Sequence, residues 1–145
     1  MSRRVHLDAN VILRYLRNDD PLQSSIASEL FKRAQSEEME LIASSVILLE
    51  VFYVLASTYG LPRVKVAEIL HTLVSSGLVV CDQRGIVLDA LQRITANKIS
   101  FGDAYLAATA VRSKEEVASF DKGLSSFKDA KLFPLESLTN SYRRL

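Results

Sequence analysis

The stretch VHLDAN, residues 5–10, decides how we interpret the rest of this sequence. It begins as a short apolar strand, reaches an acidic residue at Asp8, and is followed by a helical pattern over residues 11–17. This order places Asp8 at the carboxyl end of a strand, which is the edge where ligands bind in open α/β sheets. An Asp at such a position is also a common helix cap, so Asp8 alone does not establish a site.

Outward from this stretch, segments typical of strands alternate with segments typical of helices along all 145 residues. The alternation predicts right-handed crossovers and a mostly parallel sheet of four or five strands with helices on both faces. We therefore expect one three-layer α/β/α domain comprising residues 1–145. The expected strands are residues 4–7, 40–43, 78–81, 117–120 and 131–134. The expected helices are residues 11–17, 21–38, 46–59, 63–76, 84–95 and 101–111.

The composition excludes several classes of protein. Hydrophobic residues make up 48% of the chain, which is enough for a substantial core. The formal net charge is +1, so overall charge does not favour nucleic acid or membrane surfaces. Cys81 is the only cysteine, which excludes an intramolecular disulfide and a cysteine-based metal site. No long apolar segment follows the basic start, so we expect no signal peptide or membrane span and a cytoplasmic location.

Two acids lie in segments that are otherwise apolar. Glu50 is the only charged residue within residues 41–62, in a helix that is apolar almost all round and is therefore expected to be buried. Burying an ionised carboxylate costs on the order of several kcal/mol unless it is paired or binds a metal. Asp103 is likewise the only charge within residues 99–111. The alternatives are an exposed patch or a salt bridge for Glu50, and helix capping for Asp103.

Asp121 directly follows the expected strand 117–120, although it also has the chemistry of an ordinary turn. With Asp8, Glu50 and Asp103 it makes four isolated acids beside the core, on four separate elements. Strands one and four can be neighbours in such a sheet, which would gather these acids at one edge. Clustered carboxylates repel one another unless a cation binds, so neutralising one should not destabilise the metal-free protein. Oxygen ligands without cysteine or a nearby histidine favour Mg²⁺ or Mn²⁺, and such sites serve phosphodiester hydrolysis.

The same four stretches resemble the PIN-domain nucleases and, more narrowly, the VapC-type toxins of toxin–antitoxin pairs. The first motif of that family is similar to LDANV, residues 7–11, and its continuation through Pro21 also looks similar. The three later motifs resemble SVILLE at residues 45–50, FGDA at residues 101–104 and SFDKGL at residues 119–124. Each motif is short, but the ordered set spans nearly the whole chain.

The resemblance implies a PIN-like fold and a Mg²⁺- or Mn²⁺-dependent endoribonuclease. It implies that Asp8, Glu50 and Asp103 are the main metal-binding acids and that Asp121 completes the site. Asn10 would hydrogen-bond a ligand or the attacking water. The resemblance also implies an RNA substrate, a VapB-like antitoxin as partner, and a homodimer.

Two other functions compete with this hypothesis. A phosphorylatable receiver-like domain also gathers acids at strand ends, but it needs adjacent acids after the first strand and a lysine after a late strand. Asp8 stands alone, and Lys122 follows an acid rather than preceding one. The other alternative is a PIN-like domain that binds RNA or a protein partner without cutting. A module that does not cut RNA has no need to hold the negative charge of four acids in one place, so the four acids count against this alternative.

Overall fold

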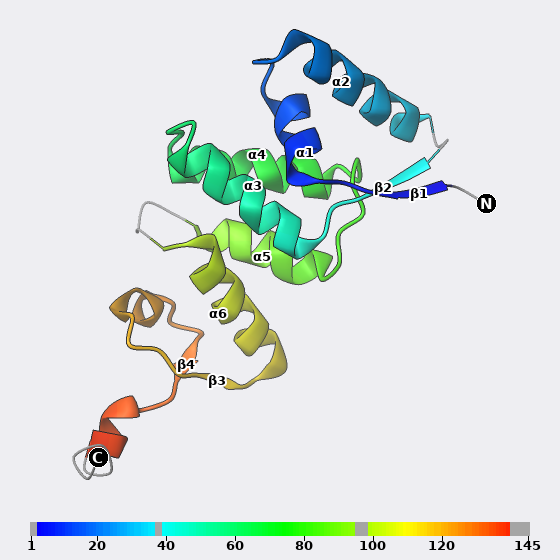
Figure 1. Ribbon diagram of the computed structural model, residues 1–145. Coiled ribbons are helices and arrows are strands. Elements are labelled where there is room, and N and C mark those ends of the chain that lie inside the picture. Colours follow the sequence, from blue (N-terminus) through cyan, green and yellow to red (C-terminus); the bar gives the residue numbers. More distant parts are fainter. Residues whose placement is uncertain (1–2, 37–38, 95–98, 140–145) are drawn as a thin grey trace.

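The structure, a computed structural model, describes residues 3–36, 39–94 and 99–139 (Figure 1). It combines helices with short parallel strands and is mostly helical, in agreement with the expected α/β class. The α-helices are α1 (Ala9–Leu16), α2 (Pro21–Gln35), α3 (Ser45–Ser57), α4 (Arg63–Ser75), α5 (Arg84–Arg93) and α6 (Phe101–Ser113). The strands are β1 (Arg3–His6), β2 (Met39–Ile42), β3 (Glu116–Val117) and β4 (Lys131–Leu132), and the 3-10 helices are η1 (Lys122–Ser126) and η2 (Leu135–Leu138).

Parallel pairing of β1 with β2 forms the first sheet. Val5 lies opposite Leu41 in the register, and the amide of Leu7 extends the ladder by donating to the carbonyl of Ile42 at 2.8 Å. The expected third strand is reduced to a single parallel bridge between Val80 and Ile42. The amide of Val80 donates to the carbonyl of Leu41 at 2.7 Å, and no longer ladder forms there within the described residues.

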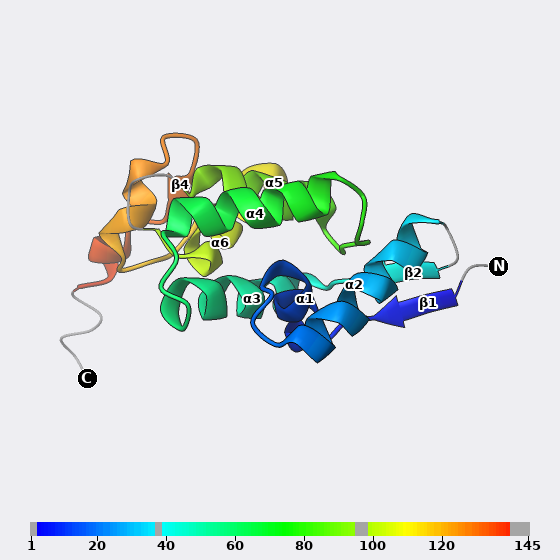
Figure 2. The same cartoon turned by 90° about the horizontal axis from the view of Figure 1, so that it is seen from above.

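The second sheet consists of β3 and β4, each only two residues long. In the part of the chain that the structure describes, β1 pairs with β2 alone, so the arrangement in which strands one and four are neighbours is not formed there. The physical reason is the course of α6, which packs along α5 and carries β3 away from β1. Both views show β1 and β4 at opposite ends of the molecule (Figures 1 and 2).

Helix starts follow the capping signals in the sequence. The Asp20 carboxylate accepts a hydrogen bond from the Gln23 amide at 3.1 Å, with Pro21 as the first helical residue of α2. The Ser44 hydroxyl accepts from the amide of Ile47 at 3.3 Å and caps α3. The helix ends predicted at residues 38 and 95 lie outside the described residues.

The helices pack in a continuous series. α1 contacts α2 and α3, and the series then runs from α3 to α4, α5 and α6 (Figure 2). Their shared core includes Ile12, Phe31, Leu48, Leu55, Leu70, Val87 and Ala104. A smaller cluster of Ala107, Ala110, Val117 and Leu124 joins α6 to β3 and η1. None of the described helices has both the length and the apolar character needed to cross a membrane.

Arg93 ties the segment after β3 to α5. Its side chain is only 12% exposed; its Nε donates to Asp89 Oδ1 at 2.9 Å, and its Nη1 donates to Asp129 Oδ1 at 2.8 Å. The guanidinium also lies over the ring of Phe127, 5.1 Å from its centroid. The hydrogen bonds from Arg93 lower the pKa of the Asp129 carboxyl below its usual value.

We expect this pair to make stability depend on acid pH. Because the pKa of Asp129 is lowered in the folded state, the stabilisation is complete above the pKa of an unfolded Asp, about 3.9. It is lost as the pH falls through the lower pKa of the folded protein. The Asp129→Asn variant should therefore show a shallower fall in the free energy of unfolding below about pH 4, measured by urea titration. Lys128→Gln serves as the control and should retain the wild-type slope, and an unchanged slope in Asp129→Asn would contradict the expectation.

Candidate active site

Asp8 lies two residues after the end of β1, at the position that precedes α1. Its backbone is extended, with φ −77° and ψ 153°, as at an N-cap, yet its side chain makes no capping hydrogen bond. The side chain is exposed to solvent. Helix capping therefore does not account for this carboxylate, and its proposed role as a ligand stays a prediction.

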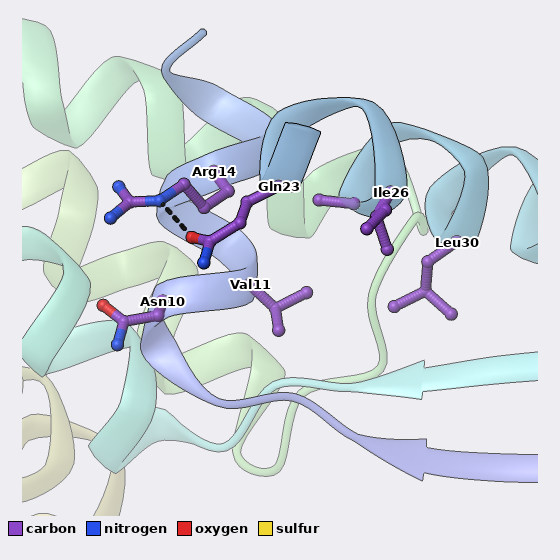
Figure 3. A pocket seen from close by; sticks show the side chains of 7 residues that line it. Asn10, Val11, Arg14, Gln23, Ile26 and Leu30 are labelled. Carbon is purple, nitrogen blue, oxygen red and sulfur yellow. Dashed lines mark hydrogen bonds between the residues drawn. The ribbon is translucent and has the colours of Figure 1, made fainter. Parts of the chain in front are cut away.

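Asn10 lines a hollow of about 310 Å³ between α1 and α2. Figure 3 shows the apolar side chains of Val11, Ile26 and Leu30 around this hollow, with Arg14 beside Gln23. Arg14 donates through Nε to Gln23 Oε1 at 2.9 Å and pairs with Asp19 at 3.3 Å. The Arg14 guanidinium is thus held by groups of its own chain rather than being simply solvated.

Glu50 is exposed, which contradicts the expectation that burial forces it to find a partner. α3 buries Leu48, Val51, Phe52 and Leu55 but leaves its other side open, where Val46 and Tyr53 are each 71% exposed. The prediction of burial was wrong because the exposed side of α3 also carries apolar residues, so the sequence pattern indicated a helix buried on every side. The role of Glu50 as a metal ligand stays a prediction. The cost of burying an ionised carboxylate no longer supports it, because Glu50 is not buried.

Asp103 and Asp121 line one cavity of about 460 Å³, formed by α3, the start of α4, the start of α6 and the turn before η1. Asp103 is half-buried in the first turn of α6, where its amide donates to the Ser100 hydroxyl at 3.0 Å. Asp121 is exposed, and its Oδ1 accepts from the amide of Gly123 at 2.8 Å. The Asp121 carboxylate therefore makes the turn hydrogen bond, whereas the Ser100 hydroxyl caps α6 and Asp103 has only the first-turn position. The other lining residues include Tyr53, Arg63, Ser100 and Phe101.

Carboxylate oxygens are suitable ligands for a hard divalent cation such as Mg²⁺. The four carboxylates do not lie close enough together in this structure to bind one ion. Neither Asp8 nor Glu50 lines the cavity that holds Asp103 and Asp121. Across residues 3–36, 39–94 and 99–139, no group of three or more His, Cys, Asp or Glu side chains is close enough to hold a metal ion. The structure therefore brings together two of the four predicted acids.

Two residues of this cavity were missed by the sequence interpretation. Tyr53 lies one helical turn after Glu50, so the i, i+3 spacing could have placed it beside a candidate site residue. Arg63, the first residue of α4, gave no signal because one Arg at a helix start is ordinary. Asp82 does not line this cavity. Its carboxylate accepts a hydrogen bond from the amide of Ser45 at 2.7 Å and so supports the start of α3.

The sequence matches the family described as PIN domain over residues 5–130. The chain belongs to the PIN domain family. A comparison with the curated proteins gave no match. PIN domains are generally nuclease domains, which are hydrolases, and typically depend on divalent metal ions. Membership of the PIN family thus points to nucleic-acid chemistry for the chain as a whole.

The first-turn position of Asp103 leads to a stability prediction. A carboxylate in the first turn of a helix is stabilising by about 0.3–1 kcal/mol through the macrodipole. The described part of this PIN domain gathers no cluster of three acids whose repulsion could be relieved. Asp103→Asn should therefore lower the free energy of unfolding by about 0.5 kcal/mol in EDTA, measured with urea. Glu68→Gln, an exposed position on α4, is the control and should change it little. A clear gain in stability for Asp103→Asn would instead indicate an acid cluster.

Proposed function

We propose that this PIN domain is a metal-dependent endoribonuclease and the toxin of a VapBC-type toxin–antitoxin module. The observation that carries the proposal is the sharing of one cavity by Asp103 and Asp121 in a chain that matches the PIN family. A cavity with two carboxylates repels a phosphodiester unless a cation is present. The ordered resemblance of all four acidic stretches to VapC-type toxins supports the narrower assignment.

In this proposal residues 1–145 form one domain with one active site. Asp8, Glu50, Asp103 and Asp121 are the metal-binding acids, Mg²⁺ or Mn²⁺ is the cofactor, and Asn10 orients a ligand or a water molecule. The proposal requires Asp8 and Glu50 to approach the cavity of Asp103 and Asp121 in the active form. Asp8 is the acid to test first, because it has no capping hydrogen bond that gives it another role.

We expect the purified protein to cut RNA in Mg²⁺ or Mn²⁺ and to stop in EDTA. Asp8→Asn should lower the rate by about 100-fold, the size typical of losing a group that stabilises transition-state charge. Glu29→Gln makes the same chemical change on an exposed part of α2 and should leave the rate unchanged. The measurement is the appearance of new RNA 5′ ends with time. Equal cleavage by Asp8→Asn, or cleavage that persists in EDTA, would refute the metal mechanism.

The proposal includes a VapB-like antitoxin, a homodimer and a cytoplasmic location. The hollow between α1 and α2 supports a protein partner, since Ile26, which lines it with Val11 and Leu30, is 61% exposed (Figure 3). Large apolar side chains exposed together often mark an interaction surface.

The antitoxin would be encoded by a short reading frame next to the gene. We expect Ile26→Asp to weaken its binding by at least about tenfold in calorimetry, because a buried unpaired charge is costly. The RNA cleavage rate of this variant serves as the control and should be unchanged. Wild-type affinity in Ile26→Asp would place the partner elsewhere.

A second candidate function is a PIN-like module that binds RNA or a protein without cutting. It is favoured by the finding that no three acids gather in the described part of the chain. Binding of RNA without cleavage in Mg²⁺ or Mn²⁺ would support it over the nuclease.

A further inference from the structure

The hollow between α1 and α2 has a polar end and an apolar end (Figure 3). Asn10, Arg14 and Gln23 lie at the polar end, where each presents a side chain with N–H groups. The opposite end is lined by side chains that carry no polar atom, those of Val11, Ile26 and Leu30. A small ligand that fills the whole hollow must therefore be polar at one end only, and its polar group must suit Arg14.

The Arg14 guanidinium is fixed along one edge and still has hydrogen-bond donors to offer. Its Nε donates to Gln23 Oε1 at 2.9 Å. Its Nη1 donates to Asp19 Oδ1 at 3.3 Å and lies 3.4 Å from the Tyr59 hydroxyl. Its Nη2 makes no hydrogen bond within the described residues, and the side chain is 26% exposed. A guanidinium held in this way is already oriented to take a carboxylate, because its planar fork matches the two carboxylate oxygens.

The charges of the hollow favour an anion over a cation. Its lining carries the positive charge of Arg14, and none of the described residues that line it is an acid. Asp19 pairs with Arg14 but does not line the hollow, and its other oxygen accepts a hydrogen bond from the Tyr59 hydroxyl. The side-chain amides of Asn10 and Gln23 add N–H donors beside the guanidinium. A carboxylate would therefore receive hydrogen bonds here, whereas an ammonium group would be repelled by Arg14.

We propose that this hollow binds a monocarboxylic acid with an apolar chain, whose carboxylate pairs with Arg14 while the chain covers Ile26 and Leu30. The volume of about 310 Å³ lies within the range of pockets that hold small ligands. Ile26 is 61% exposed, so a chain laid against it removes apolar surface from water. Binding of the acid does not depend on the proposed nuclease function. Only its consequence rests on that function: the acid occupies the surface proposed for the antitoxin and competes with it.

Octanoate is the probe, and binding is followed through the amide chemical shifts of isotope-labelled protein at neutral pH. We expect a Kd on the order of 0.1–1 mM, as for other ligands of about ten non-hydrogen atoms. The shift changes should be confined to α1, α2 and the turn between them. Octylamine has the same chain with the opposite charge, and acetate has the carboxylate without the chain. Each of them should bind at least about tenfold more weakly than octanoate.

Three variants test the two ends of the hollow. Arg14→Gln should weaken octanoate binding about tenfold, because a charge-assisted hydrogen bond is lost. Arg33→Gln makes the same chemical change on α2 outside the hollow and should bind octanoate as the wild type does. Since Arg14→Gln also removes the hydrogen bonds to Gln23 and Asp19, Ile26→Ser tests the apolar end without breaking any of them, and it should weaken binding about fivefold. Circular dichroism of each variant checks that the fold is retained.

The outcomes separate this inference from the proposed function. Equal binding of octylamine and octanoate, equal affinities of Arg14→Gln and Arg33→Gln, or shift changes centred on other elements would each overturn the inference, even if RNA is cleaved normally. Saturating octanoate should also lower the affinity for the antitoxin. Octanoate binding that depends on Arg14 but leaves the antitoxin affinity unchanged would sustain the acid site and place the protein partner elsewhere.

Discussion

The fold depends on the burial of one side of α3. Leu48, Val51 and Leu55 are completely buried there, and α3 contacts α1, α4 and α6. Each of these side chains contributes about 1.5–3 kcal/mol by leaving water, so α3 fixes where its neighbours lie. Because the same helix is open on its other side, it also brings Tyr53 to the cavity that holds Asp103 and Asp121. A single helix thus links the core to the candidate site.

Local features of this PIN domain were well predicted from the sequence. Helix α2 starts at Asp20 with Pro21 and helix α3 at Ser44, which are residue types that mark a helix start from sequence alone, because capping depends on residues within one turn. Gly60, three residues after the end of α3, has a φ of +67°, which few other residues adopt easily. Signals of this kind are read over a few residues and need no knowledge of the fold.

Long-range features were predicted less well. Pairing between β1 and a later strand depends on the path of α6 along α5, which no local pattern encodes. Burial of Glu50 was inferred from the apolar residues around it, but these include Val46 and Tyr53, which face solvent. Two of the four predicted acids, Asp103 and Asp121, share a cavity, whereas Asp8 and Glu50 do not line it. Hydrophobicity indicates that a helix has a buried side but does not indicate how wide that side is.

The start of β1 has a consequence for the behaviour of the protein in solution. Within the described residues β1 pairs only with β2, so the backbone groups along its other edge have no strand beside them. An open edge can recruit strands from other molecules and lead to aggregation. Arg3 is exposed on this strand, whereas the Arg4 guanidinium pairs with Glu40 of β2 at 2.9 Å. Two copies approaching edge to edge would bring their Arg3 charges together, and a charged side chain on an edge strand opposes uncontrolled self-association.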